Sequence, residues 1–455
     1  MIKLNAIFKN RKNQNYLIPL AIYGIFIICA AIGMIIYPGS FYKLISNTQL
    51  SPIRYYYMDV EHYATMAVKP SCLAFYPLWP FIIRNLFHPQ TIEQAAHYFI
   101  IVANIIFFIT NFLIFRIFKT AFKKTILAFL IMLAFTVNPM AIFRVNGYTE
   151  SIFSLFSAIF IWCCLPQNKL HQNIKIMILF IITFLMSLTR PILIQMIFST
   201  TATLITIIGL ELFKIKRYSW TDVLNQIQKY KAEITKTLTI WLAAISGYAV
   251  YGSFCLQTRG NFFAPFDDQK LWGKKLGFYP DLLLFPKSPL IDLIGLYLPI
   301  IITLIFLLLT YYQFSKQENI ISVPKHKFWW NILYLYPPLL IIVYTYHWIK
   351  SRKEPNNLTQ LKISSFTEKL ANNYITWFCF YFAVAHSLVS FITFNKLLSL
   401  GRYSFATPFF FAGLGYLCCC IPGKRKYQTL LLMTGISAFM LVEQWIKYGQ
   451  HKWLG

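Results

Sequence analysis

The sequence predicts an all-α protein that crosses a membrane many times. Of its 455 residues, 57% are hydrophobic and only 13% are charged, whereas about 25% are charged in an average soluble domain. The mean hydropathy is +0.55. Apolar runs of about 20 residues recur along the chain, which is the length a helix needs to cross the hydrocarbon core of a bilayer. We expect one integral membrane domain over residues 1–455, with about 11 to 13 transmembrane helices.

The N-terminal part predicts a cytoplasmic start and a large first external loop. Residues 1–15 are polar and basic, which favours the cytoplasmic side of a membrane. The first apolar run, about 16–37, is long and lacks a small-residue cleavage pattern, so we interpret it as a span rather than a signal peptide. Residues 38–97 then form the first external loop. The alternation of spans places a second external loop at 257–288.

Further spans are expected at the remaining apolar runs, which lie near 98–118, 125–143, 150–165, 174–189, 191–213, 237–256, 289–312, 329–349, 374–394, 404–422 and 428–446. The basic segment 214–236 has the spacing of a helix on the cytoplasmic membrane surface. One contradiction remains, because basic residues at 316–327 and at 350–353 both indicate the cytoplasm although 329–349 would cross once. The side of the C-terminus is therefore left open.

The net charge of +27 predicts contact with a lipid bilayer and not with nucleic acid. Lys and Arg occupy short loops beside spans, where anionic headgroups favour them, and no sizeable soluble region carries a basic stripe with exposed aromatics. Most of the nine cysteines lie in apolar runs without metal-ligand spacing, so we expect small core residues. The triple cysteine at 418–420 is a candidate for acylation, but a core role is favoured.

The first external loop contains the strongest candidates for chemistry. In a short helix that begins near residue 58, Asp59, His62 and Tyr63 share one face because they are three and four residues apart. Glu61 points elsewhere, so Asp59 is the better candidate for an acid held towards a cleft. The aromatic segment 75–80 follows with two prolines, which predicts a rigid return to the membrane surface.

A second polar cluster comprises Asn138-Pro139 and the segment 148–151, which includes Tyr148 and Glu150. Proline near a span end is commonly only a kink or an exit, and Glu150 also suits the positive end of the next helix. The cluster is thus open to a structural or a functional interpretation.

Ionisable side chains at span boundaries are functional candidates, because an unpaired charge in lipid costs several kcal/mol. Arg190 and Arg402 are the strongest, although both are also compatible with arginines that snorkel to the membrane surface. Arg144 and Glu443 lie in comparable places. His386 lies within a span and is expected to be a hydrogen-bonded core residue, so it is left out of the site.

The order of these motifs resembles the PIG-V family of GPI mannosyltransferase 2 enzymes. Residues 59–63 and 74–80 are similar to that family's Asp-x-x-His/Trp-Phe/Tyr and Ala-Phe-Phe-Pro-x-x-Pro stretches, and Asn138-Pro139 with 148–151 is similar to its Asn-Pro…Tyr-Ser/Thr-Glu segment. Thr189-Arg190 and Gly401-Arg402-Tyr403 also follow in family order. The family usually has Trp before the acid, where this chain has Met58, and the loop 257–288 matches poorly.

The resemblance implies a GT-C type glycosyltransferase with its active site on the external or luminal face. The donor would be a polyprenyl- or dolichyl-phosphate sugar, typically mannose, and the acceptor a glycolipid or glycan. Asp59 would be the base, with Glu61 and His62 as close support. The implied substrate-binding residues are Tyr63, Tyr148, Glu150, Arg190 and Arg402, with the two arginines as phosphate binders.

The residue chemistry is compatible with that implication. A phosphate leaving group needs no acid to protonate it, so one base and a few cations suffice, and net inversion is expected at the anomeric carbon. No glycine-rich nucleotide cradle and no metal motif is present in the sequence. We expect no cofactor, although some GT-C enzymes use a divalent cation.

Two other functions stay open. The intramembrane charges are compatible with a transporter or lipid flippase, and Met58 is compatible with a non-catalytic subunit whose site has decayed. The sequence does not identify the acceptor. Its Ile-, Phe-, Asn- and Lys-rich composition favours a bacterial inner (plasma) membrane; in a eukaryote the location would be the ER membrane.

Overall fold

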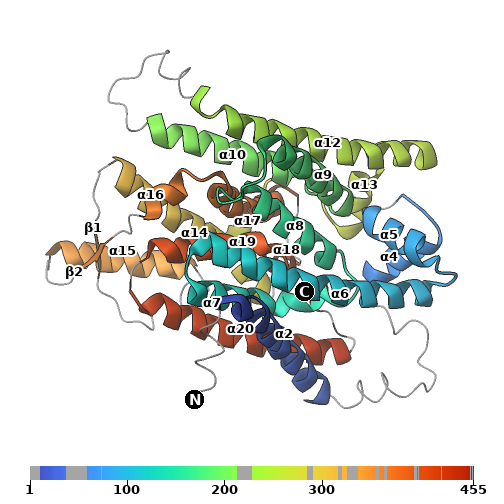
Figure 1. Ribbon diagram of the computed structural model, residues 1–455, viewed down its shortest axis with the longest axis horizontal. Helices are drawn as coiled ribbons and strands as arrows, with labels where there is room; N and C mark the ends of the chain where they lie inside the picture. Colours follow the sequence, from blue (N-terminus) through green and yellow to red (C-terminus); the bar gives the residue numbers. More distant parts are fainter. Residues whose placement is uncertain are drawn as a thin grey trace.

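The computed structural model describes most of the chain, namely residues 11–36, 59–72, 74–212, 228–283, 290–315, 320–324, 337–353, 358–362, 366–393, 397, 399–421, 423–450, 452 and 454. Helices dominate these residues (Figure 1). The elements up to the middle of the chain are α2 (Arg11–Ile36), α4 (Asp59–Val68), α5 (Leu78–Phe87), α6 (Ile92–Phe122), α7 (Thr125–Thr136), η2 (Pro139–Arg144), α8 (Glu150–Cys164), α9 (Gln172–Thr189) and α10 (Leu193–Leu212).

The second half continues in the same way. Its elements are α12 (Lys231–Arg259), α13 (Ala264–Asp267), η3 (Asp268–Trp272), η4 (Pro280–Leu283), α14 (Leu290–Ser315), β1 (Ile320–Pro324), α15 (Pro337–Lys353), β2 (Leu358–Lys362), α16 (Phe366–Ala371), α17 (Tyr374–Thr393), α18 (Leu400–Phe405), α19 (Pro408–Cys420) and α20 (Arg425–Gly449).

The predicted fold class, a helical multi-pass membrane protein, is confirmed. Within the described residues, eight helices are long and apolar enough to cross a membrane, and three shorter apolar helices, α7, α8 and α19, accompany them. Counting the short helices as spans gives the lower end of the predicted range. The span predicted at 329–349 is not among the eight helices. Its described part belongs to α15, which does not meet the length and hydropathy of a span.

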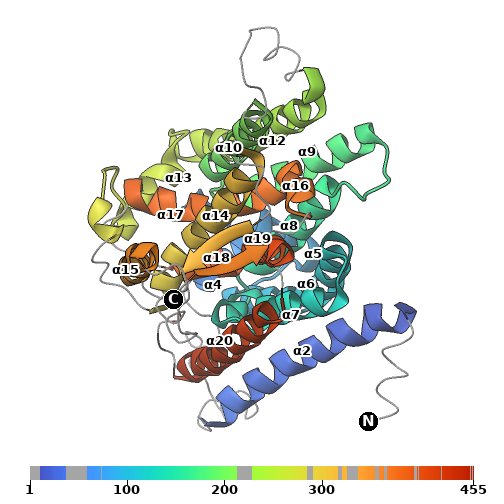
Figure 2. The ribbon, with the colours of Figure 1, turned by 90° about the vertical axis from the view of Figure 1, so that its left-hand side faces the viewer.

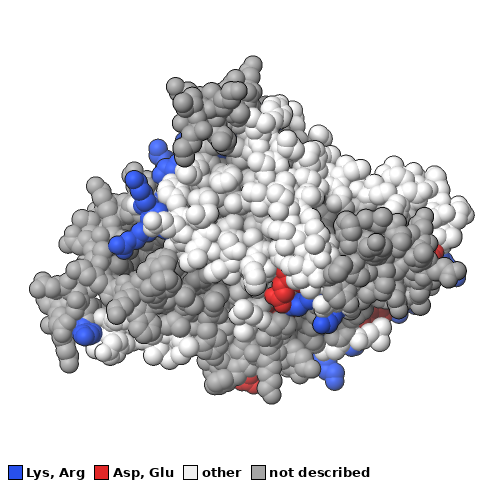
Figure 3. All heavy atoms as spheres, turned by 90° about the horizontal axis from the view of Figure 1, so that it is seen from below, with Lys and Arg blue, Asp and Glu red and all other residues white. Residues whose placement is uncertain are grey.

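The long helices lie side by side and expose apolar side chains. α9, α10 and α12 form one layer, while α2 and α20 pack together on the opposite side of the bundle (Figure 2). Phe26 of α2 contacts Trp445 of α20, with ring centroids 6.2 Å apart. Much of the face in Figure 3 carries neither basic nor acidic side chains. Such a surface suits lipid, because hydrocarbon gives exposed charges no partner.

The two strands resolve the contradiction about the sides of the membrane. β1 pairs with β2 in antiparallel register, with Ile320 opposite Lys362 and Pro324 opposite Leu358. The chain therefore leaves β1 and returns to β2 at one place, which means that the segment between them starts and ends on the same side. A segment that starts and ends on one side no longer conflicts with the cytoplasmic signal that the sequence carries at both of its ends.

Short elements gather at the two ends of the bundle. α4, α5 and α13 lie together at the right of Figure 1, whereas β1, β2, α15 and α16 lie at the left. α6 connects the two ends. Thr91 caps its start by accepting a hydrogen bond from the Gln94 N–H, and Lys123 ends it with a φ of 56°. At 31 residues, α6 is about 46 Å long, enough to span a bilayer.

Several expectations fall on residues outside this description. They are most of the first loop before residue 59, including Met58, and the basic segment up to 227.

The interpretation of the cysteines needs one correction. Seven cysteines are free and buried as predicted, but Cys72 and Cys255 form a disulfide across 183 residues. Cys255 was predicted to be a core residue because it lies in an apolar run. Nothing in that run indicates that it pairs with Cys72.

Candidate active site

The site begins at the N-terminus of α4. Asp59 is the first residue of this helix, where its carboxylate complements the partial positive charge of the helix end. Val60, Tyr63 and Ala64 are buried and pack against α6. The side chain of Asp59 is 19% exposed. The short helix predicted for this stretch is thus present, with Asp59 and Tyr63 on its inner side.

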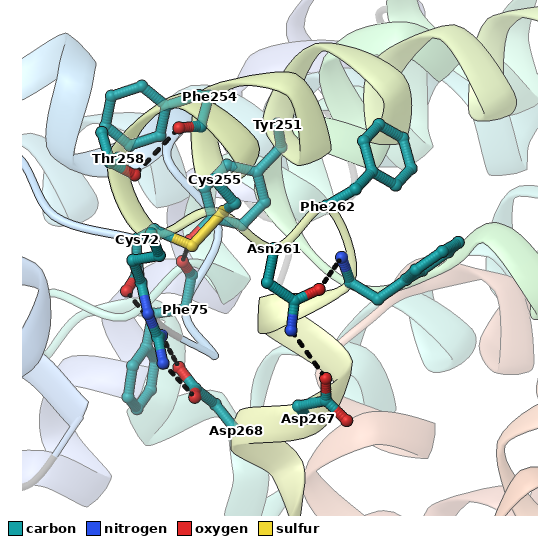
Figure 4. Close-up of a disulfide and its surroundings, with 12 residues drawn as sticks. Cys72, Phe75, Tyr251, Phe254, Cys255, Thr258, Asn261, Phe262, Asp267 and Asp268 are labelled. Carbon is teal, nitrogen blue, oxygen red and sulfur yellow. Dashed lines mark hydrogen bonds and ion pairs between the residues drawn. A yellow bond between two sulfur atoms is a disulfide. The ribbon is translucent and has the colours of Figure 1, made fainter.

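Cys72 and residues 74–76 form the next part of the site and are fastened to the C-terminal end of α12 (Figure 4). Cys72 is bonded to Cys255, and the Tyr251 hydroxyl donates to the Phe75 carbonyl oxygen at 2.7 Å. Arg259 donates to the Cys72 carbonyl oxygen at 3.1 Å and holds the Asp268 carboxylate at 2.6 and 3.1 Å. These bonds join residues of the two predicted external loops through the end of α12.

The turn before α8 places Glu150 in the interior. Asn138 accepts a hydrogen bond from the Met140 N–H and so begins η2, as its position before Pro139 favours. The Trp79 indole donates to the Gly147 carbonyl oxygen at 2.9 Å and ties α5 to this turn. Glu150 then starts α8 with no exposed surface.

Arg402 is delivered by α18, a short helix held at both ends. At its start, the Asp292 carboxylate of α14 accepts hydrogen bonds from the Ser399 and Gly401 N–H groups at 3.1 and 2.8 Å. At its end, Arg144 donates to the Phe405 and Ala406 carbonyl oxygens, both at 3.0 Å. An acid at the first turn and a cation at the last both complement the helix dipole.

A glycine contact brings α14 and α18 close together. A Cβ at Gly401 would lie 2.8 Å from the Ile291 carbonyl oxygen, and a Cβ at Gly295 would lie 2.8 Å from the Gly401 Cα. Only glycine permits this approach of two backbones. The Ser404 hydroxyl also donates to the Gly295 carbonyl oxygen at 3.1 Å. α18 is therefore a fixed platform for Arg402.

Four charged side chains form one network. Arg402 donates through Nη1 to Asp59 Oδ2 at 2.6 Å and through Nε to Glu150 Oε1. Arg190 Nη2 lies 3.3 Å from the same Glu150 oxygen. Glu150 and both arginines are at least nine-tenths buried. Removing charges from water is costly unless each is paired, so the four residues depend on one another.

The network opens onto a cavity of about 130 Å³. Its lining comes from every motif of the sequence and also from the predicted second external loop. The lining residues are Asp59, Tyr63, Ala74, Phe75, Tyr76, Thr149, Thr189, Arg190, Pro191, Gln269, Lys274, Ser399, Arg402 and Tyr403.

Other predicted residues lie around this cavity. Tyr148 packs beneath Arg402, whose guanidinium carbon is 4.5 Å from the ring centroid. Glu150 lies behind the two arginines. His62 stacks on Phe75 at 4.7 Å between centroids. Glu61 is exposed and is not part of the lining, in agreement with the face predicted for it. The catalytic or binding role of each residue stays a prediction.

The two tyrosines near Asp59, Tyr63 and Tyr148, keep their phenol protons at neutral pH. Burial raises the pKa of Tyr63 and of Tyr148 above the ordinary phenol value, and the negative charge of Asp59 raises both further. Among the residues with described positions, no group of three or more His, Cys, Asp or Glu side chains could hold a metal ion. Asp59 and Glu150, the carboxylates nearest the cavity, both bind Arg402.

Several site residues were not expected from the sequence, among them Gln269, Lys274 and Asp292. Asp292 has a signal that points to it, because an acid inside an apolar run is costly unless it has partners. Lys274 and Gln269 have none, since lysine and glutamine are ordinary in a polar loop.

Comparisons with known proteins find little. The sequence matches no protein-family model and no curated protein. Among solved structures, one similar chain is the Archaeoglobus fulgidus oligosaccharyltransferase tethered to an acceptor peptide with the NVT sequon. The identity is 12% and the TM-score 0.32, over 89% of this chain and 56% of that one. At so low a TM-score, neither the fold nor the activity of that enzyme is carried over.

Proposed function

We propose that this protein is a GT-C type, PIG-V-like membrane glycosyltransferase. It would move a sugar, which the resemblance implies to be mannose, from a polyprenyl-phosphate donor to a hydroxyl of a glycolipid or glycan acceptor. The observation that carries the proposal is the meeting of distant motifs at one cavity. Asp59, Glu150, Arg190 and Arg402 are spread over 343 positions and nevertheless form a single charged network.

Asp59 is the base in this proposal. The acceptor hydroxyl loses its proton to the Asp59 carboxylate as its oxygen bonds to the anomeric carbon. The bond from that carbon to the phosphate oxygen breaks at the same time, so the configuration inverts and the phosphate leaves with the electron pair. Arg402 keeps the carboxylate in place through the 2.6 Å contact, because a positioned base is what makes such a transfer efficient.

The cavity has a charge that suits a phosphate leaving group. It carries Arg190, Arg402 and Lys274, and the carboxylates of the network are Asp59 and Glu150. This leaves one cation in excess. Fixed positive charge near a departing phosphate stabilises the charge that develops there. The proposal needs no cofactor, since these side chains of the chain supply both the base and the cations.

Two observations favour an external active site. The Cys72–Cys255 disulfide lies beside the cavity, and disulfides persist in oxidising compartments outside the cytosol. At the other end of α6, Lys119, Lys123 and Lys124 form a basic group that favours the cytoplasm. We therefore propose that the cavity faces the periplasm, or the ER lumen in a eukaryote.

The test compares the purified wild type with Asp59→Asn, using labelled polyprenyl-phosphate-mannose and a panel of glycolipid and glycan acceptors. The expected result is a loss of transfer of about 10²- to 10⁴-fold, the usual contribution of a general base. Glu443→Gln, on an exposed ion pair with Lys447, is the matched control and should keep full transfer. Equal transfer by wild type and Asp59→Asn would remove Asp59 from the mechanism. No transfer by the wild type, together with lipid movement in liposomes, would favour a flippase.

A further inference from the structure

The three cations of the cavity differ in how they are paired. Arg402 binds the carboxylates of both Asp59 and Glu150, and Arg190 binds that of Glu150. Lys274 lines the same cavity, and its Nζ donates to the neutral side-chain oxygen of Gln269 at 2.7 Å. Across the described part of the chain, no carboxylate lies within ion-pair distance of Lys274. Its charge is the one that a bound anion would neutralise.

The backbone holds Lys274 at this place. η3 ends at Gly273, whose φ of 74° turns the chain back and suits glycine. The Lys274 N–H then donates to the Gln269 carbonyl oxygen at 3.2 Å, so the two residues are joined through both backbone and side chains. Lys274 is half-buried. A lysine that is held against a cavity loses less freedom on binding a ligand than an exposed one.

The loop around Lys274 is anchored to the rest of the protein. The N–H groups of Lys275, Gly277 and Tyr279 donate to the carbonyl oxygens of Thr393, Ile392 and Phe391 at 2.8, 3.0 and 2.8 Å. These carbonyls belong to the last turn of α17, where the helix itself supplies no donor. Two neighbours, Leu276 and Phe278, are 89% and 77% exposed. The loop thus presents apolar side chains beside a cation.

The reaction itself separates the base from the leaving group. In an inverting displacement the acceptor and the departing phosphate occupy opposite faces of the anomeric carbon, so the cation in contact with the base is poorly placed to bind the phosphate. Arg402 contacts Asp59 directly. Lys274 comes from a different element and has no such contact.

We propose that Lys274, held by Gln269, is the binding subsite for the donor's phosphate, with Leu276 and Phe278 contacting the lipid chain attached to it. The inference rests on the proposed function, and it differs from the resemblance, which implies the arginines for this role. The ligand chemistry is a phosphate ester, and the exposed apolar neighbours favour a lipid-linked phosphate over a soluble one.

The experiment measures affinity separately from transfer. Purified wild type, Lys274→Gln and Lys275→Gln are titrated with undecaprenyl phosphate, undecaprenol and mannose 1-phosphate, with tryptophan fluorescence as the signal. Lys275 is exposed and does not line the cavity, so Lys275→Gln removes the same charge one residue away. Lys274→Gln should weaken undecaprenyl phosphate about 10- to 100-fold, as expected for a hydrogen bond to a charged group. Undecaprenol should bind both variants equally, and Lys274→Arg should recover part of the affinity.

Each outcome decides a separate point. Equal affinities of Lys274→Gln and Lys275→Gln, in a protein whose wild type transfers sugar, would overturn the subsite and leave the proposed function standing. Mannose 1-phosphate that binds the wild type as tightly as undecaprenyl phosphate would overturn the lipid-linked assignment. A wild type that neither binds undecaprenyl phosphate nor transfers sugar would overturn both proposals. Thermal unfolding of Lys274→Gln at the wild-type temperature confirms that the fold is intact.

Discussion

The cavity has two sides that are built in opposite ways. On the buried side, which comprises Asp59, Glu150, Arg190 and Arg402, each cation meets a carboxylate. The loop side, made of Gln269 and Lys274, lies in a partly exposed segment. Substitution of one residue on the buried side leaves the charge of another residue unpaired. A substitution on the loop side does not. In the functions proposed above, the buried side holds the base and the loop side binds the phosphate of the donor.

The supports of the two sides differ as well. α18 is held by a buried acid, a buried arginine and a close glycine contact. The loop side is held by the disulfide, the Arg259–Asp268 ion pair and backbone hydrogen bonds to α17. Substitutions on each side should therefore have different consequences for stability and for binding.

The largest expected effect is on the buried side. Glu150→Gln removes the carboxylate shared by Arg190 and Arg402 and leaves two buried cations short of a partner. We expect the free energy of unfolding to fall by about 3–5 kcal/mol, with loss of transfer, as measured by thermal unfolding in detergent and by the transfer assay.

The control for Glu150→Gln is Glu443→Gln. That carboxylate lies 2.7 Å from Lys447 on an exposed helix face, so its loss should cost less than about 1 kcal/mol. Equal stability of the two variants would contradict the interdependence of the four buried charges.

Next comes the disulfide that links Cys72 to the end of α12. Replacing Cys72 and Cys255 with serine should lower the free energy of unfolding by about 2–4 kcal/mol, within the usual range for a disulfide. Affinity for undecaprenyl phosphate should also fall, because Lys274 lies on the loop that this bond supports. Reductant should reproduce the change in the wild type and have no further effect on the double variant. A reductant effect of equal size in both proteins would mean that another group responds.

A smaller effect is expected where α14 meets α18. Gly401→Ala would place a Cβ 2.8 Å from the Ile291 carbonyl oxygen, and the resulting shift should cost about 1–3 kcal/mol. Because Arg402 follows directly, transfer should fall more than donor affinity does. Gly435→Ala is the matched control. No atom lies within 4 Å of a Cβ added there, and alanine should stabilise that helix by up to about 1 kcal/mol. Unchanged transfer by Gly401→Ala would show that the position of α18 is not critical.

The smallest effect is expected on the loop side. Leu276→Ser should leave the free energy of unfolding within about 0.5 kcal/mol of the wild type, because the side chain is 89% exposed. Loss of a few methylene contacts should weaken undecaprenyl phosphate by about 3-fold and leave mannose 1-phosphate unaffected. Leu431→Ser, exposed on α20, controls for general lipid contact and should bind like the wild type. A weaker affinity for both ligands in Leu276→Ser would argue against contact with the lipid chain.

The sequence predicted the fold class, and it drew attention to the residues of the buried side for different reasons. Arg190 and Arg402 are conspicuous because a charge at a span boundary is costly. Asp59 was chosen for the helix face that it shares with Tyr63, and Glu150 was left open. Their mutual contact was not predictable, because Asp59 and Arg402 are 343 residues apart. The motif order suggested a shared site, but only the folded chain shows that the carboxylates bind the arginines.

The loop side was beyond prediction. Lys274 is one lysine among many in polar loops, and nothing local distinguishes it. The disulfide was missed because cysteine pairing cannot be deduced from spacing alone. α15 was interpreted as a span from its apolar character, whereas the pairing of β1 with β2 shows that the chain returns to where it started.

The pairing of β1 with β2 also allows the segment between them to be altered independently of the rest of the protein. Because β1 and β2 close the ends of their intervening segment together, its length can vary without a force on α14 or α16. Insertion of extra sequence there should be tolerated, as at other closed surface excursions. The same position offers a site for a reporter domain or an affinity handle at the end of the bundle opposite the cavity (Figure 1).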